Sequence, residues 1–100
     1  MLCAHTIRRL KDGTFDQFAE GFMPSDQDPP PGWVRFHMLR SLSNPNEVVT
    51  FGFFDGAAEE LERSQAGSDY QSRRDTVDPY VDEVLANGLY EIVAARSAEG

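Results

Sequence analysis

The chain has 100 residues, of which 40% are hydrophobic and 26% charged, and its formal net charge is −8. This length suits one domain over residues 1–100. An acidic chain repels nucleic-acid phosphates, and no apolar run approaches the roughly 18 residues of a membrane span, so we expect neither nucleic acid nor membrane as a partner. The single cysteine cannot form an internal disulfide, and the arginines near the N-terminus do not fit an export signal. We therefore expect a cytoplasmic protein.

The first part of the chain predicts a strand followed by a helix. Residues 2–10 are rich in β-compatible side chains and precede the turn signal Lys-Asp-Gly. A helix is predicted to begin after Thr14, which has capping-box spacing to Gln17. The prolines of residues 25–32 predict a stiff, extended loop after this helix. The apolar stripe of the helix comprises Phe15, Phe18, Ala19 and Phe22.

The centre of the chain predicts a β-hairpin. Its strands are Trp33–Leu42 and Glu47–Phe54, joined by Ser-Asn-Pro-Asn, and this loop places Leu42 opposite Glu47. Alternation then gives one face that is apolar enough to pack under helices, with Arg40 at its rim. The residues of this face are Val34, Phe36, Met38, Leu42, Val49, Phe51 and Phe53.

The second face of the predicted hairpin mixes polar and large apolar side chains. A monomer would leave its apolar members in water, so we expect something to cover them. Gly52 is predicted opposite His37, where a missing side chain leaves room for a neighbour. Either a second subunit packs here, with His37 merely hydrogen-bonded in the interface, or the face lines a ligand site. Its residues are Trp33, Arg35, His37, Leu39, Val48, Thr50, Gly52 and Phe54.

The remainder predicts two helical pieces. An acidic helix is expected over residues 56–63, and residues 64–76 show no clear pattern. A second helix is predicted from Asp78, with Pro79 in its first turn and Gly88 as its C-terminal cap. Its apolar stripe comprises Val77, Tyr80, Val81, Val84 and Leu85.

A final strand is predicted over residues 89–95, which completes the order β-α-β-β-α-β with the second α in two pieces. This is the ferredoxin-like order of an α+β fold. It normally gives a four-stranded antiparallel sheet with helices on one face.

Three stretches of the chain resemble the antibiotic biosynthesis monooxygenase-like superfamily. They are RLKDGTFDQFAEGF, LRSLSNPNEVVTFGFFDGAAEEL and DPYVDEVLANGLYEIV. They match its strand-turn-helix opening, its central hairpin running into an acidic helix, and its closing helix and strand. The resemblance implies a homodimeric α+β barrel formed through the open sheet faces, with a cavity for a small hydrophobic or aromatic ligand in each subunit. Activities in the superfamily include cofactor-independent oxygenation of polycyclic phenols, haem degradation and small-molecule isomerisation.

Oxygenation of a small aromatic or phenolic compound without a cofactor requires a base, a group that stabilises the phenolate, and aromatic walls. His37 is the candidate base and Arg35 the candidate stabiliser. The face of the first strand that carries His5 is left open. The substrate-binding candidates are Trp33, Thr50, Gly52, Phe54 and His5.

Two other functions are weighed against this one. For haem degradation, the resemblance would require an asparagine on the first strand and an axial histidine on a helix. The sequence has Cys3, Ala4 and His5 on the first strand and no histidine after His37, so haem degradation is not expected. No carboxylate has an evident place beside the two histidines, so no metal site is expected. The alternative class is a non-enzymatic dimeric module that binds a small molecule or has a structural role.

Overall fold

The computed structural model describes residues 1–23 and 30–96. Most of the predicted extended loop over residues 25–32 lies outside this range. Residues 2–10 and 47–54 form strands with the predicted bounds, and the first hairpin strand ends two residues earlier than predicted. The elements are β1 (Leu2–Leu10), α1 (Phe15–Phe22), β2 (Trp33–Arg40), β3 (Glu47–Phe54), α2 (Ala58–Ala66), α3 (Ser68–Val77), a 3-10 turn (Asp78–Tyr80) and β4 (Val81–Glu91).

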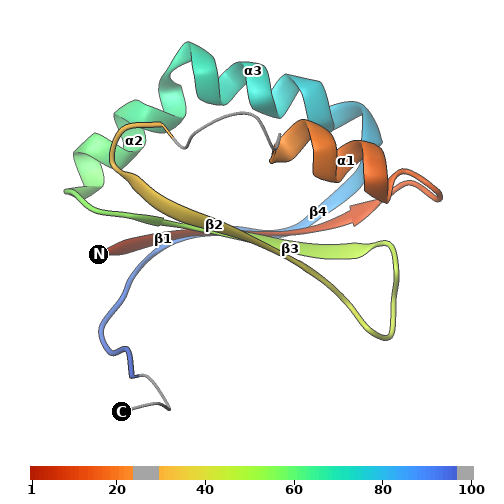
Figure 1. The fold of residues 1–100 in the computed structure, drawn as a ribbon, viewed down its shortest axis with the longest axis horizontal. Helices are drawn as coiled ribbons and strands as arrows, with labels where there is room; N and C mark the ends of the chain where they lie inside the picture. The colour runs from red at the N-terminus through yellow and green to blue at the C-terminus, as the bar shows by residue number, and fades with distance from the viewer. Residues whose placement is uncertain (24–29, 97–100) are drawn as a thin grey trace.

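The strands form one antiparallel sheet in the order β2-β3-β1-β4, and the three helices lie on one of its faces (Figure 1). This confirms the predicted α+β fold. We name the face beneath the helices the covered face and the other the open face. No helix within residues 1–23 and 30–96 is long and apolar enough to cross a membrane.

The β1–α1 connection follows from local sequence. Gly13 has φ 74°, a conformation that glycine adopts at little cost, and the chain turns there. The Thr14 hydroxyl donates a hydrogen bond of 2.7 Å to the Lys11 carbonyl oxygen, so the predicted capping bond to the helix does not form. Phe18 is completely buried, which stabilises the fold by about 2 kcal/mol and fixes the helix on the sheet.

The prediction for residues 78–88 is wrong. Asp78 and Pro79 begin a single 3-10 turn, and Val81–Glu91 then pair with β1 along the edge of the sheet. The helix-start signal at Asp78 and Pro79 therefore gives only one helical turn. The edge of β1 offers backbone N–H and C=O groups that would stay unpaired if the following residues continued as a helix. The final strand therefore begins eight residues before the predicted position of Leu89.

The segment without a clear pattern contains the α3 helix. Its polar composition hides the stripe that packs inward, and among its described side chains only Val77 at its end is completely buried. Two core clusters result, one under α1 and α3 and one under α2. The first contains Leu10, Phe18, Val48 and Val77, and the second Trp33, Phe54 and Leu61.

The predicted register of the hairpin is wrong by one residue. His37 lies opposite Phe51, and Phe36, not His37, lies opposite Gly52. The loop begins at Ser41, whose amide donates to the Glu47 carbonyl oxygen, and Leu42 is fully exposed. Because β3 carries large apolar side chains on both faces, alternation alone could not select the register.

This one-residue difference in register places each side chain of β3 on the face opposite to the predicted one. Val48, Thr50, Gly52 and Phe54 lie on the covered face, while Val49, Phe51 and Phe53 lie on the open face. On β2, Phe36 and Met38 pack toward the helices as predicted, with Arg40 at the rim over the Phe15 ring. Trp33 is buried with them, because an irregularity between Trp33 and Arg35 shifts the pairing, and Val34 is half exposed.

Candidate functional site

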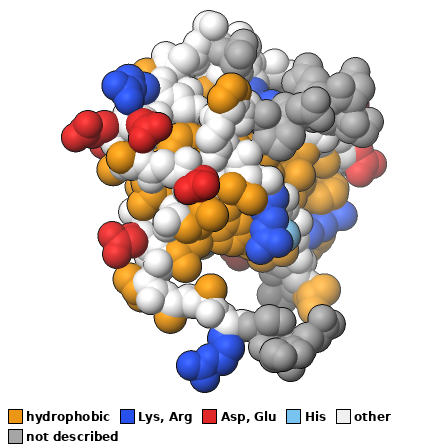
Figure 2. Space-filling model, turned by 60° about the vertical axis from the view of Figure 1, so that its left-hand side comes forward, with side chains coloured by type: hydrophobic (Ala, Val, Ile, Leu, Met, Phe, Trp, Pro, Cys, Tyr) orange, Lys and Arg blue, Asp and Glu red, His pale blue; other side chains and the backbone are white. Residues whose placement is uncertain are grey.

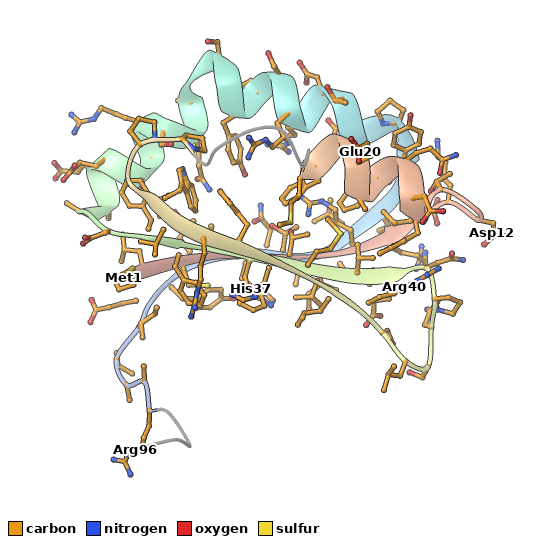
Figure 3. All side chains as sticks on the ribbon, in the orientation of Figure 1. Met1, Asp12, Glu20, His37, Arg40 and Arg96 are labelled. Carbon is orange, nitrogen blue, oxygen red and sulfur yellow. The ribbon has the colours of Figure 1, made fainter. Side chains whose placement is uncertain are left out.

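The residues predicted as one site lie on two faces of the sheet. Figure 3 places His37 on the side away from the helices, and Arg35 and His5 share that open face. The other candidates lie under the helices, so the predicted grouping around His37 is wrong. These covered candidates are Trp33, Thr50, Gly52 and Phe54.

Gly52 leaves room for side chains of the protein itself. A β-carbon built at Gly52 would lie 2.7 Å from Cδ1 of Phe36 and 2.8 Å from Cζ3 of Trp33. The two rings stack with centroids 5.0 Å apart, and the Trp33 indole N–H donates a hydrogen bond of 2.9 Å to the Ser64 hydroxyl. The glycine thus allows two aromatic rings to pack flat against β3.

The two histidines lie on either side of Phe51, on β1 and β2. The His37 ring stacks on Phe51 with a centroid distance of 4.9 Å, and His5 is paired with Phe51 from the other side. His5 contacts the Tyr90 ring edge-on at 5.9 Å, and its Nδ1 is buried with no hydrogen-bond partner among the described residues. The face of His5, which the sequence left open, is therefore the face of His37.

The open face is largely apolar. Leu39 and Tyr90 are 49% and 55% exposed, and the Arg35 guanidinium carbon lies 4.9 Å from the centre of the Phe53 ring. Figure 2 shows hydrophobic side chains gathered in a patch with a histidine and basic side chains beside it. Other apolar members of the face are Ile7, Val49 and Phe51.

The covered face contains a charged group that the sequence analysis missed. Arg8 is only 8% exposed, and its guanidinium donates a hydrogen bond of 2.7 Å to the Thr50 hydroxyl. The guanidinium carbon lies 5.5 Å and 5.3 Å from the ring centres of Phe18 and Phe22. A guanidinium has five N–H donors, so Arg8 keeps donors available for a ligand.

The surroundings of Arg8 are unfavourable for its charge. Burial lowers the pKa of the guanidinium, because desolvation disfavours the charged form, and the nearby charge of Arg74 acts in the same direction. Tyr70 and Asp78 partly oppose this effect. Among the side chains that the structure describes in residues 1–23 and 30–96, which do not include that of Asp69, no carboxylate lies within ion-pair distance of Arg8. A buried, unpaired cation of this kind marks a candidate binding site.

A signal for Arg8 was present in the sequence. Side chains of a strand alternate between faces, so Arg8 must share the face of Leu10, two positions away. Once Leu10 is assigned to the core, Arg8 is placed beneath the helices.

Arg8 lies at a small cavity between the sheet and the helices, which we name the inner cavity. Its volume is about 20 Å³, room for about one water molecule. Thr50 contributes its polar wall beside Arg8. The aromatic walls are Phe22, Trp33, Phe36 and Tyr70.

Comparison with known proteins gives matches of structure only. No protein-family model matches the sequence, and no curated protein matches it significantly. A candidate antibiotic biosynthesis monooxygenase from Chloroflexus aurantiacus superposes with a TM-score of 0.73 at 15% identity, covering 96% of each chain. Another, from Nitrosomonas europaea, gives 0.71 at 20% identity, covering 94% of this chain and 100% of the other. The chain has the fold of the antibiotic biosynthesis monooxygenases.

The same fold occurs in SnoaB, a cofactor-independent oxygenase from Streptomyces nogalater. The structure of a SnoaB variant superposes on this chain with a TM-score of 0.66 at 16% identity, covering 94% of each chain. These matches confirm the resemblance at the level of fold. At such low sequence identities the shared fold does not establish the role of any residue of this chain.

Proposed function

We propose that this chain is a cofactor-independent oxygenase of small aromatic compounds that carry a phenolic oxygen, which it binds in the inner cavity. The buried Arg8 guanidinium is the observation that carries the proposal. It lies among aromatic rings, has Thr50 as its one hydrogen-bonded side-chain partner among the described residues, and has N–H donors for an oxygen anion. The occurrence of the fold in an oxygenase that needs no cofactor supports the same conclusion.

Arg8 would act by stabilising the ionised substrate. A cation in a partly dehydrated cavity favours a phenolate strongly, because little solvent screens the pair. The phenol proton is released to water, and the electron-rich ring carbon reacts with dioxygen. In the simplest case a ring CH₂ becomes C=O, while the second oxygen atom leaves as water with both hydrogens of that carbon.

The aromatic walls would hold the ring of the substrate. The Trp33 and Phe36 rings fill most of the space above Gly52, so binding requires one of them to move. Trp33 is the only tryptophan of the chain, and its fluorescence therefore reports binding directly.

We also propose that two copies pack through their open faces. The support is the apolar composition of this face. Of the four residues that motivated a dimer in the sequence, only Leu39 lies there, since Trp33, Val48 and Phe54 are buried by the helices. The apolar area that remains, including Phe51 and Phe53, is large for a surface in contact with water.

The catalytic roles of His37 and Arg35 stay predictions from the sequence. Both side chains lie across the sheet from Arg8, so a role in the chemistry of the inner cavity would have to cross the sheet. Their contacts with Phe51 and Phe53 fit a role in the proposed dimer.

One observation favours the second candidate function, a non-enzymatic binding or structural module. The inner cavity has room for about one water molecule. A protein that never opens this cavity would use the same aromatic residues only for packing.

Oxygen uptake with 1,8-dihydroxyanthrone distinguishes the two functions. We expect the protein to accelerate formation of the corresponding quinone, with one dioxygen consumed per product. Arg8→Gln should lower the protein-dependent rate by about 100-fold, as for the loss of an oxyanion donor. Arg63→Gln, the same change on the exposed side of α2, is the matched control. No acceleration by the wild-type protein, or full activity of Arg8→Gln, would contradict the proposal.

A further inference from the structure

A second hollow lies between α3 and the edge strand β4, and we name it the α3 groove. Its volume is about 300 Å³, far more than that of the inner cavity. Helix α3 and β4 form its two sides, and the end of α2 contributes Gln65. The other main residues are Tyr70, Gln71, Arg74, Asn87 and Leu89.

The α3 groove and the inner cavity share a wall. Tyr70 lines both of them. Arg74 follows Tyr70 by four residues on α3, so the two side chains lie one turn apart on the same side of the helix. The charge of Arg74 is close enough to act on Arg8, although burial has the larger effect on the pKa of Arg8. Arg8 at the inner cavity and Arg74 at the α3 groove therefore form one region with two cations, and Asp78 offsets part of the effect on Arg8.

This region is unusual for so acidic a chain. The sequence has 17 acidic and 9 basic residues, yet among the described residues the only ion pairs are those of Arg9 with Asp82 and Glu83. No carboxylate side chain that the structure describes lines the α3 groove. Among the described side chains, Arg8 and Arg74 have no ion-pair partner, which suits a ligand that brings its own negative charges.

The uncharged groups of the groove are also suited to an acid. The Asn87 Oδ1 accepts a hydrogen bond of 3.2 Å from the Thr6 hydroxyl, which leaves the Asn87 NH₂ group available as a donor. With the planar fork of Arg74, this gives donors from β4 and α3, an arrangement that suits a planar carboxylate.

We infer that the ligand is an aromatic compound with two acidic groups, whose phenolic oxygen binds Arg8 in the inner cavity and whose carboxylate binds Arg74 in the α3 groove. The inference rests on the proposed binding of a phenolic ligand at Arg8. It adds that Arg74, with Asn87, selects substrates that carry a carboxylate.

Calorimetric titration with 6-hydroxy-2-naphthoate and with 2-naphthol, which lacks the carboxylate, tests this inference. The wild-type protein should bind the naphthoate about tenfold more tightly, the effect of one partly exposed charge-assisted hydrogen bond. Arg74→Gln should remove this preference and leave the affinity for 2-naphthol unchanged. Arg8→Gln should weaken both ligands, and Arg63→Gln should weaken neither.

The outcomes separate the two proposals. Equal binding of the two ligands by the wild-type protein overturns the role of the α3 groove without requiring any variant to fold. A preference that survives in Arg74→Gln overturns it as well, while loss of both ligands in Arg8→Gln still supports the proposed site. If Arg8→Gln binds both ligands normally, the proposed site at Arg8 fails and the inference fails with it.

Discussion

The guanidinium of Arg8 and the hydroxyl of Thr50 meet across the β1–β3 pair at 2.7 Å, beneath the helices. This contact holds a cation in the core of a protein with a net charge of −8. Thr50 can accept one hydrogen bond from Arg8 but cannot neutralise its charge. The pair therefore has the properties of a binding site more than those of a stabilising contact.

Arg8→Met tests this view through stability. Methionine keeps most of the packing against Phe18 and Phe22 and removes the desolvated charge, whose cost the lowered pKa of Arg8 reflects. We expect the free energy of unfolding in urea to stay unchanged or rise by on the order of 1 kcal/mol, as in other replacements of buried charges by apolar groups. A loss of several kcal/mol would show that Arg8 is a structural residue.

Gly52→Ala should disturb the aromatic pair of the covered face. The added methyl group would clash with Phe36 and Trp33, and overpacking of this kind costs about 1–3 kcal/mol. Urea unfolding measures the loss, and the Trp33 emission should shift with it. Gly88→Ala is the matched control, because its new contact is with the half-exposed Tyr90, which can move. Equal losses in both variants would argue against specific packing at Gly52.

Val49→Lys tests the proposed dimer. Val49 lies between Ile7 and Leu39 in the middle of the open face, where a lysine would be buried between two copies. Light scattering should give twice 11.2 kDa for the wild-type protein and 11.2 kDa for the variant. Leu42→Lys, in a fully exposed loop position, should keep the dimer mass. A monomeric wild-type protein at micromolar concentration would contradict the proposed assembly.

His37→Ala separates the open face from the inner cavity. His37 stacks on Phe51 across the sheet from Arg8, so we expect ligand affinity and turnover to stay within about threefold of wild type. Calorimetry and oxygen uptake measure the two quantities independently. A selective loss of turnover with unchanged affinity would instead support the predicted role of His37 as the base.

Cys3 gives a pH-dependent test of the open face. Burial raises the pKa of its thiol, so at a given pH the folded protein has less of the reactive thiolate. We expect reaction with a disulfide reagent at pH 8 to be several-fold slower in the folded protein than in urea. The folded state holds this proton more tightly, so the free energy of unfolding should fall as pH rises through the ordinary range of thiols. Equal rates in both states would contradict this.

The sequence by itself determined the first elements of the fold. The signals that were sufficient are local, and each acts within a few residues. They are the turn signal after Leu10, the phenylalanine stripe of α1 and the turn-forming residues at the two ends of β3. The ferredoxin-like order also followed, because two pieces of helix were expected between β3 and the last strand. Their positions, however, were partly wrong.

Tertiary structure decided three matters that local pattern could not. The hairpin register depends on which face the helices cover, and β3 is apolar on both faces. Residues 81–88 became strand because the edge of β1 offered backbone partners, which no local signal at Asp78 could reveal. The separation of His37 from Thr50 followed from the same choice of face. In each case the deciding contacts join residues far apart in the chain, so the physical reason lies in the packed sheet and not in any one segment.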